Sequence, residues 1–173
     1  MSVNHLTRSA VPPFLPAVGV PADAVAEGWP TVWWIGCHGG SGSSTLARLT
    51  GLGRDFPPGW PLFPPAWPIA EVVLVCRASA TGVLAATGAV EQWRRRAAPP
   101  QVRVRGLVAV AASPRKPPRI VVERLQLLAG WVPALWRVGW QEVLLAADDP
   151  TDVGIPHDVA ALRDSIVRVM TNN

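Results

Sequence analysis

The 173-residue chain lacks tyrosine and has one lysine and two cysteines, although it contains nine tryptophans and 19 prolines. Two cysteines are too few for the disulfide framework of a small secreted domain. The sequence has no run of about 18 apolar residues, so no membrane-spanning helix is expected. Its start lacks the charged segment, apolar stretch and small-residue cleavage site of a secretory leader. These absences favour a soluble, cytoplasmic protein.

Apolar residues make up 49% of the chain, which is enough to bury a core in one domain. Neither a Gly-X-Y repeat nor a heptad period is present, so collagen-like and coiled-coil structures are excluded. The net charge of +4 comes from 15 arginines and one lysine against 12 acids. This excess of arginine, with abundant Ala, Val and Pro, is typical of a GC-rich genome. It is therefore weak evidence for a nucleic-acid partner.

Apolar runs alternate with helical patterns along the chain. The runs predict buried strands over residues 31–36, 71–77, 102–112 and 132–138. Helices are predicted from Thr45 to about Thr50, over 79–96, from Pro118 to Gly130, and over a last segment with Val159, Leu162, Ile166 and Val169 on one face. Strands that alternate with helices form βαβ units, so we expect a three-layer α/β fold with a small, mainly parallel sheet of about four or five strands.

Proline divides the chain into segments. Residues 54–68 hold six prolines and are incompatible with a central strand or a helix interior, so a packed irregular loop is predicted there. Residues 1–28 also carry several prolines and no clear period, which favours a loosely ordered N-terminal arm from which Phe14 and Leu15 could dock on the body. Residues 29–173 are expected to form a single domain.

The glycine-rich segment that follows the first predicted strand has the pattern of an anion site. Glycine allows the backbone to curl so that successive N–H groups converge, and a helix N-terminus adds positive potential. Here the glycines are followed directly by a predicted helix start. The predicted phosphate-binding residues are Gly39, Gly40, Ser41, Gly42, Ser43, Ser44 and Thr45, with Arg77 from the end of the next strand.

The stretch CHGGSGSST, residues 37–45, resembles the deviant Walker A loop of the ParA/MinD ATPases. The family pattern is KGGxGK followed by two Ser/Thr residues. His38 stands at the signature lysine, Ser43 at the lysine that grips the phosphates, and Ser44 at the hydroxyl that binds magnesium. GGSGSSTLA is more similar to the lysine-free loops of the CpaE-like pilus-assembly branch.

Further segments extend this resemblance over about residues 31–170. EVVLVCRASATGVLAATGAVEQW is similar to the strand and helix that follow the Walker B region, VRVRGLVAVAA to the next strand, and VPALWRVGW to the strand that carries the "IP" element. The resemblance implies a P-loop-like fold, ATP or another nucleotide with Mg²⁺, and a role in positioning, partition or assembly that involves a protein partner or self-association. The pattern also resembles actinobacterial proteins of similar length, some of them borne on mobile or conjugative elements, which imply no activity.

The acids of the family pattern are not found in this sequence. ParA/MinD proteins have two further strands before the EVVLVCR-like strand, and these carry the acids that support magnesium and polarise water. Here the interval holds only the proline-rich segment, whose sole acid is Asp55. The sequence therefore predicts nucleotide or phosphate binding without efficient hydrolysis. The alternative is a pseudo-NTPase that serves only as a protein-interaction scaffold.

Several residues near the loop admit two interpretations. Arg77 could replace the missing lysine, or it could be solvated or paired with Asp148 or Asp149. Cys37, His38 and Cys76 could form a metal or redox site, or they could be two ordinary buried cysteines and an exposed histidine. HGGSG also occurs in the oxyanion loops of some esterases, but the G-x-S-x-G elbow that those enzymes need is missing.

Arginines and tryptophans elsewhere also leave alternatives open. We expect one set of basic residues at the end of the sheet away from the loop: Arg94–Arg96, Arg103 and Arg105. A second set is expected on the loop side: Arg115, Lys116 and Arg119. Either set could contact nucleic-acid phosphates or be a solvated basic face. Five tryptophans are expected either to belong to the core or cover the surface, or to form a protein-binding patch. They are Trp60, Trp67, Trp131, Trp136 and Trp140.

Overall fold

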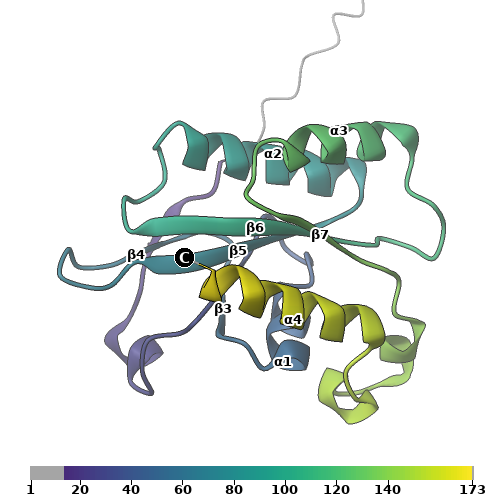
Figure 1. Cartoon of the computed structure of the whole chain (residues 1–173), viewed down its shortest axis with the longest axis horizontal. Coiled ribbons are helices and arrows are strands. Elements are labelled where there is room, and N and C mark those ends of the chain that lie inside the picture. The colour runs from purple at the N-terminus through teal and green to yellow at the C-terminus, as the bar shows by residue number, and fades with distance from the viewer. Residues whose placement is uncertain (1–13, 173) are drawn as a thin grey trace, which may run out of the picture.

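The computed structural model describes residues 14–172. The strands are β1 (Ala17–Gly19), β2 (Trp33–Gly36), β3 (Arg54–Phe56), β4 (Trp60–Leu62), β5 (Ala70–Arg77), β6 (Val102–Val110) and β7 (Leu135–Val138). The α-helices are α1 (Ser43–Thr50), α2 (Ala80–Arg94), α3 (Arg119–Ala129) and α4 (His157–Thr171), and short 3-10 helices are η1 (Ala22–Val25), η2 (Glu142–Ala146) and η3 (Pro150–Val153). Figure 1 shows three layers, with α2 and α3 on one face of the sheet and α1 and α4 on the other.

The main sheet has five parallel strands in the order β3-β2-β5-β6-β7. The three-layer α/β fold with a small parallel sheet is therefore confirmed. Strand order reverses between β2 and β5, since the chain leaves β2 towards β3 at one edge and returns at β5 towards the other edge. Right-handed crossovers in opposite directions place α1 and α2 on opposite faces of the sheet.

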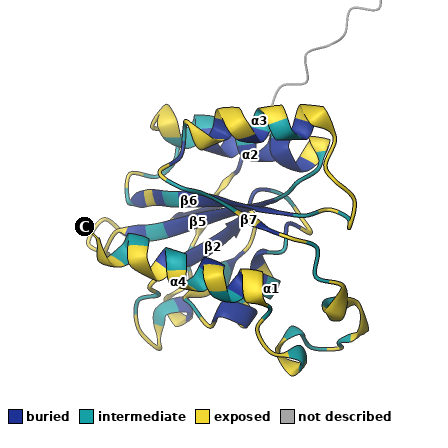
Figure 2. Cartoon of the chain, turned by 45° about the vertical axis from the view of Figure 1, so that its right-hand side comes forward, coloured by how far each residue is buried: buried dark blue, intermediate teal, exposed yellow. Residues whose placement is uncertain are grey.

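The central strands are buried on both faces, so two separate cores form (Figure 2). Side chains alternate across a strand, and the adjacent residues Trp33 and Trp34 therefore belong to different cores. Trp33 packs in the core under α2 and α3, whereas Trp34 packs in the core over α1 and α4. Both indoles are fully buried, which explains why β2 and β5 read as continuous apolar runs.

The proline-rich interval is more regular than the sequence predicts. Instead of an irregular loop alone, it contains β3 and β4. β3 pairs in parallel with β2, placing Asp55 opposite Trp34, and it ends immediately before Pro57. Proline is tolerated beside an edge strand because the missing N–H is not needed by a further neighbour. β4 forms a small separate sheet with β1.

Residues 1–13, nearly half of the segment expected to be a loose arm, lie outside the described residues. Residues 14–28 are held against the body. Leu15 is buried, its N–H donates to Gln92 Oε1 at 3.0 Å, and Gln92 Nε2 donates to its carbonyl at 2.8 Å. Arg54 Nη1 donates to the carbonyl of Ala24 at 2.6 Å. The packed part of the chain thus includes residues before 29.

The tryptophans belong mainly to the interior. Trp29, Trp33, Phe63 and Trp67 form a chain of edge and tilted ring contacts with centroid separations of 4.9–6.0 Å. A protein-binding patch is the alternative for five tryptophans. All five are buried or half-buried, which supports the interpretation as core residues: Trp60, Trp67, Trp131, Trp136 and Trp140. Over residues 14–172, none of the helices has the length and apolar character needed to cross a bilayer.

Two glycines in the α1–β3 turn provide a matched test of this packing. Gly51 and Gly53 both have a positive φ, 64° and 61°, but only Gly53 is in tight contact: a Cβ there would lie 1.9 Å from the carbonyl oxygen of Val32. We expect Gly51→Ala to cost about 1–2 kcal/mol of unfolding free energy for the left-handed backbone alone. Gly53→Ala should cost more than about 4 kcal/mol, because the β2–β3 pairing must also shift. Urea unfolding of both variants measures the difference, and equal losses would contradict this packing.

Candidate functional site

Residues 37–42 join the carboxyl end of β2 to α1, and the predicted phosphate-binding residues 39–45 lie in this connection and in the first turn of the helix. β5 is the neighbouring strand, and its carboxyl end carries Arg77 and the turn into α2. The two connections diverge to opposite faces of the sheet at this point. In doubly wound sheets, a crevice suited to ligands forms where the strand order reverses in this way.

The loop backbone leaves most of its amide groups without partners. Gly40 and Gly42 have φ values of 72° and 100°, a left-handed region that glycine adopts without strain. Gly39 and Gly40 form a turn. Outside this turn, the amides from His38 to Thr45 make one contact within residues 14–172, a weak one from Ser43 to Ser41 Oγ at 3.4 Å. Such a run of free N–H groups at a helix N-terminus is the arrangement that holds anions.

A hollow of about 290 Å³ adjoins these amides. One side consists of the loop and the first turn of α1, and the other consists of the end of β3 with the prolines that follow it. Arg77 also lines the hollow. The predicted site residues Gly39, Gly40, Ser41, Gly42, Ser43, Ser44, Thr45 and Arg77 are thus all brought to one hollow.

Asp55 also lines the hollow, although sequence reasoning gives it no role there. Ser44 Oγ donates to Asp55 Oδ2 at 2.7 Å, and the other oxygen, Oδ1, is buried with no partner among the described residues. The β2–β3 pairing causes this contact, because it carries Asp55 along the sheet edge to the first turn of α1. The available signal is that Asp55 is the only acid in the interval, but a three-residue strand between glycine and proline has no periodicity by which to place it.

Arg77 connects the loop to the neighbouring strand ends. Its Nε donates to the carbonyl of Gly40 at 3.0 Å, and its Nη1 donates to the carbonyl of Ala111 at 3.2 Å. The predicted alternative, a pair with Asp148 or Asp149, is not formed; Asp149 instead pairs with Arg48. Two hydrogen bonds use only part of the guanidinium, so other N–H donors of Arg77 remain for a ligand.

His38 supports the loop from the side of α2. Its Nε2 accepts a hydrogen bond from the backbone N–H of Arg77 at 3.0 Å, and its Nδ1 lies 2.8 Å from the carbonyl of Gly39. The two contacts are satisfied together by the neutral ring with the proton on Nδ1. The side chain of residue 38 therefore links the loop to β5.

Cys37 directly follows β2, and Cys76 lies near the end of β5; the residues before them, Gly36 and Val75, are paired across the two strands. Both cysteines are buried free thiols. Burial raises the pKa of the Cys37 thiol well above its usual range, and the nearby Cys76 raises it further. Burial also raises the pKa of Cys76 to about 12. Protonated thiols are poor nucleophiles and poor metal ligands, so these observations favour two structural cysteines over a metal or redox site.

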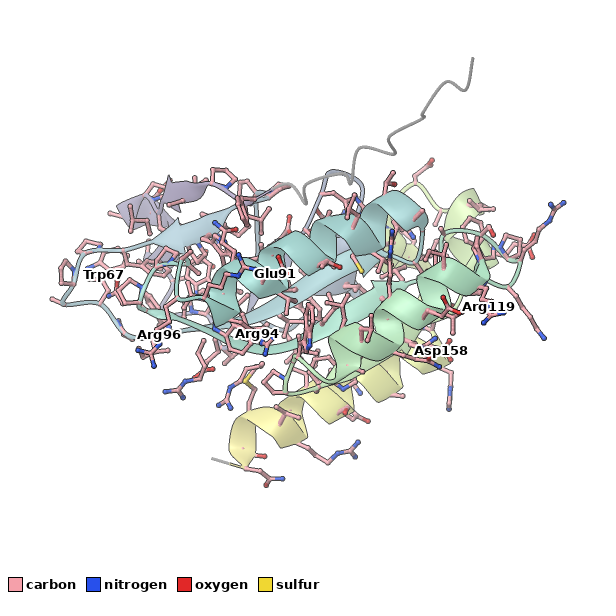
Figure 3. All side chains as sticks on the ribbon, turned by 90° about the horizontal axis from the view of Figure 1, so that it is seen from above. Trp67, Glu91, Arg94, Arg96, Arg119 and Asp158 are labelled. Atoms are coloured by element: carbon pink, nitrogen blue, oxygen red, sulfur yellow. The ribbon has the colours of Figure 1, made fainter. Side chains whose placement is uncertain are left out.

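The two sets of basic side chains distinguished in the sequence lie at opposite ends of the molecule, as predicted. Figure 3 shows Arg94 and Arg96 at one end and Arg119 at the other. At the first end, Arg103 and Arg105 both pair with Glu71, and Arg94 stacks on Trp131 at 4.8 Å from the ring centroid. Charges that are paired or stacked within the protein contribute less to an outer face for nucleic acid.

Comparisons of this chain with models of protein families, with curated proteins and with solved structures found no match. The proposals on function below therefore rest on the sequence pattern of residues 37–45 and on the geometry described above.

The buried thiols provide a prediction about pH. An unfolded thiol ionises near pH 9, whereas folded Cys76 keeps its proton to about pH 12, so the unfolded state releases protons first. Unfolding free energy should therefore fall as pH rises from about 9, by up to about 1.4 kcal/mol per pH unit for each thiol. The chain has no tyrosine and one lysine, so few other groups titrate in this range. Urea unfolding between pH 8 and pH 11 measures the slope.

The control for this experiment is Cys76→Ala, for which the slope should be smaller than in the wild-type protein. In parallel, a thiol reagent at neutral pH should label neither cysteine in the native protein and both after denaturation. Rapid labelling of native Cys37 or Cys76 would contradict the structural role.

Proposed function

We propose that residues 38–45 bind the phosphate groups of a nucleotide, with ATP and Mg²⁺ as the first candidates, and that hydrolysis is inefficient. The observation that carries the proposal is the run of unpartnered amides at the carboxyl end of β2, beside a hollow that Ser44, Asp55 and Arg77 also line. The resemblance of CHGGSGSST to deviant Walker A loops supports a nucleotide over other anions, and it supports a role in positioning, partition or assembly.

Anion binding by this loop relies on the backbone. Neither of the two lysines of the family pattern is present, and charged hydrogen bonds are worth about 1.5–3 kcal/mol each. Loss of one such contact lowers affinity by about one to two decades. Arg77 supplies a positive charge at the same hollow and is held there by Gly40 and Ala111. We therefore expect affinity for nucleotide in the micromolar to millimolar range.

Ser44 and Asp55 fit the requirements of a magnesium ion that accompanies the phosphates. Mg²⁺ prefers oxygen ligands and is held by one or two protein oxygens together with substrate phosphates and water. Ser44 Oγ and the carboxylate of Asp55 lie within one hydrogen bond of each other, and Asp55 Oδ1 is a buried oxygen that lacks a partner among the described residues. Bound magnesium would neutralise charge on the phosphates there, while Asp55 orients the Ser44 hydroxyl.

Inefficient hydrolysis follows from the side chains around the hollow. Of the residues that line it, Asp55 is the only acid, and it accepts the hydrogen bond of Ser44. His38 has both ring nitrogens in contact with the backbone. The ring of His38 is therefore not free to position a water molecule for attack. We assign Asp55 to Ser44 and magnesium, so none of the lining residues serves as the dedicated side chain that phosphoryl transfer requires for this task.

A scaffold function is the second candidate, and exposed apolar residues next to the loop favour it. Val143 and Leu145 of η2 are 51% and 69% exposed, and Leu145 also lines a hollow that Gly42 and Arg77 share. A protein partner, or a second copy of the chain, that covers η2 would then contact the loop region directly. A nucleotide bound at the loop would then control the association. Alternatively, the loop binds no nucleotide and serves only as part of the interaction surface.

Nucleotide binding predicts a thermal shift that depends on the loop. Ligand at about 100 times its dissociation constant adds roughly 2.7 kcal/mol of stability, so Mg-ATP, Mg-GTP or ADP at millimolar concentration should raise the melting temperature. Gly42→Val should abolish the shift, because its φ of 100° is strained for valine. Ser44→Ala, which leaves the backbone unchanged, should reduce it. Gly51→Ala is the matched control outside the hollow.

If neither a nucleotide nor inorganic phosphate changes the melting temperature, the binding proposal is wrong and the scaffold function remains. A shift that survives both Gly42→Val and Ser44→Ala would place the site elsewhere. Release of phosphate from ATP by the wild-type protein, abolished in Ser44→Ala, would overturn the assignment of inefficient hydrolysis.

Asp55 should act through magnesium. Asp55→Asn keeps the shape of the side chain and removes its charge, so the gain in nucleotide affinity on adding Mg²⁺ should fall by about tenfold or more. Affinity for ATP in EDTA should be unchanged or slightly higher, since a negative charge beside the phosphates is gone. Asp152→Asn, an exposed acid on η3, is the control. An unchanged magnesium dependence in Asp55→Asn, measured by titration calorimetry, would show that Asp55 has no part in the metal site.

A further inference from the structure

A second hollow lies further along the carboxyl edge of the sheet, beyond Arg77. Its volume is about 330 Å³, and it is formed by the ends of β5, β6 and β7 together with the segment 111–118 that leads into α3. It shares no lining residue with the hollow at residues 38–45. Two residues labelled in Figure 3 adjoin its lining: Arg119 directly follows Pro118, and Asp158 accepts a hydrogen bond from Gly139.

The walls of this hollow are apolar and built from small residues. They include Ala78, Ala80, Ala109, Ala111, Leu125 and Val138. Alanines at the strand ends leave space that larger side chains would fill, and α3 closes the space through Leu125. A water molecule takes up about 30 Å³ of liquid, so the hollow accommodates on the order of ten non-hydrogen atoms. This is the lower end of the volumes that small-molecule sites have.

Cations outnumber acids at its rim. Arg115, Lys116 and Arg137 line the hollow, and no carboxylate within residues 14–172 pairs with any of the three. No Asp or Glu contributes to the lining. Asp158 lies close by, but its Oδ2 accepts the backbone N–H of Gly139 at 3.2 Å. Three unpaired cations around an apolar cavity create a local positive potential that selects anions.

We infer that this hollow is a binding site for a small organic anion with a compact apolar body, such as an aromatic or branched carboxylate. The apolar body would displace water from the alanine walls, which stabilises the bound state in proportion to the area buried. The anionic group would lie at the rim among Arg115, Lys116 and Arg137. A simple inorganic anion would leave the walls unused, and a neutral apolar molecule would leave the cations unused.

Binding of 1-naphthoate to the full chain tests the inference, because this acid has a rigid apolar body of about the right size. The neutral 1-naphthamide and the small anion acetate are the matched ligands. Titration calorimetry should show saturable binding of 1-naphthoate, with 1-naphthamide and acetate each at least about tenfold weaker. In amide-resolved NMR spectra, the shifts should centre on Ala78, Ala112 and Gly139, with little change at residues 38–45.

Two variants separate the charge contribution from the cavity contribution. Arg137→Gln should weaken 1-naphthoate by roughly threefold, the effect of one partly solvated charge contact, without changing binding of 1-naphthamide. Arg168→Gln, an exposed arginine of α4 away from the hollow, is the control. Ala80→Leu, at an exposed position at the start of α2, should weaken both naphthyl ligands by filling the space.

The site would be overturned by no saturable binding of 1-naphthoate up to its solubility limit. Equal affinity for 1-naphthoate and 1-naphthamide would overturn the role of the rim, and shifts centred on residues 38–45 would assign the ligand to the phosphate loop. Tighter binding of a short single-stranded oligonucleotide than of 1-naphthoate, lost in Arg137→Gln, would reassign the cations to nucleic acid. None of these results depends on whether a nucleotide binds at the loop.

Discussion

The parallel pairing of β2 with β5 is the constraint on which the site depends. These neighbours are buried on both faces, and their connections leave the sheet in opposite directions, towards α1 and α2. The backbones of the two connections therefore diverge beyond the ends of the strands, where no neighbouring strand is available to form hydrogen bonds with their N–H and C=O groups. The free amides of the loop, the guanidinium of Arg77 and the ring of His38 all lie in this gap because of that divergence.

A short edge strand completes the site from the other side. β3 has only three residues, yet its pairing with β2 brings Asp55 to Ser44 and lines the hollow with the prolines that follow. Proline stops the strand and stiffens the segment beyond it, so the carboxylate is held without a long element to support it. Gly53 permits the turn before the strand, because its backbone lies so close to Val32 that there is no room for a Cβ atom. The acid and the loop are thus joined by backbone geometry.

Charge is distributed unevenly along the sheet. At the amino ends of the strands, Glu71 pairs with two arginines and Trp131 covers another. At the carboxyl ends, the guanidinium of Arg77 donates to two carbonyl groups, and Arg115, Lys116 and Arg137 have no carboxylate partners among the described residues. Unpaired cations cost stability through mutual repulsion, and ligand anions relieve that repulsion. Both hollows that we propose as binding sites open along this carboxyl edge.

Apolar periodicity in the sequence determined the α/β class, the order of the long strands and helices, and the loop that begins α1. These features follow from local rules, since continuous apolar runs mark buried strands and glycine marks the loop. Only the tertiary structure decided that residues 54–56 pair with β2, that Asp55 meets Ser44, and that Arg77 bonds to the loop instead of Asp149. The physical reason is that these contacts join residues far apart in sequence through three-residue pairing and single hydrogen bonds, which leave no periodic trace in the chain.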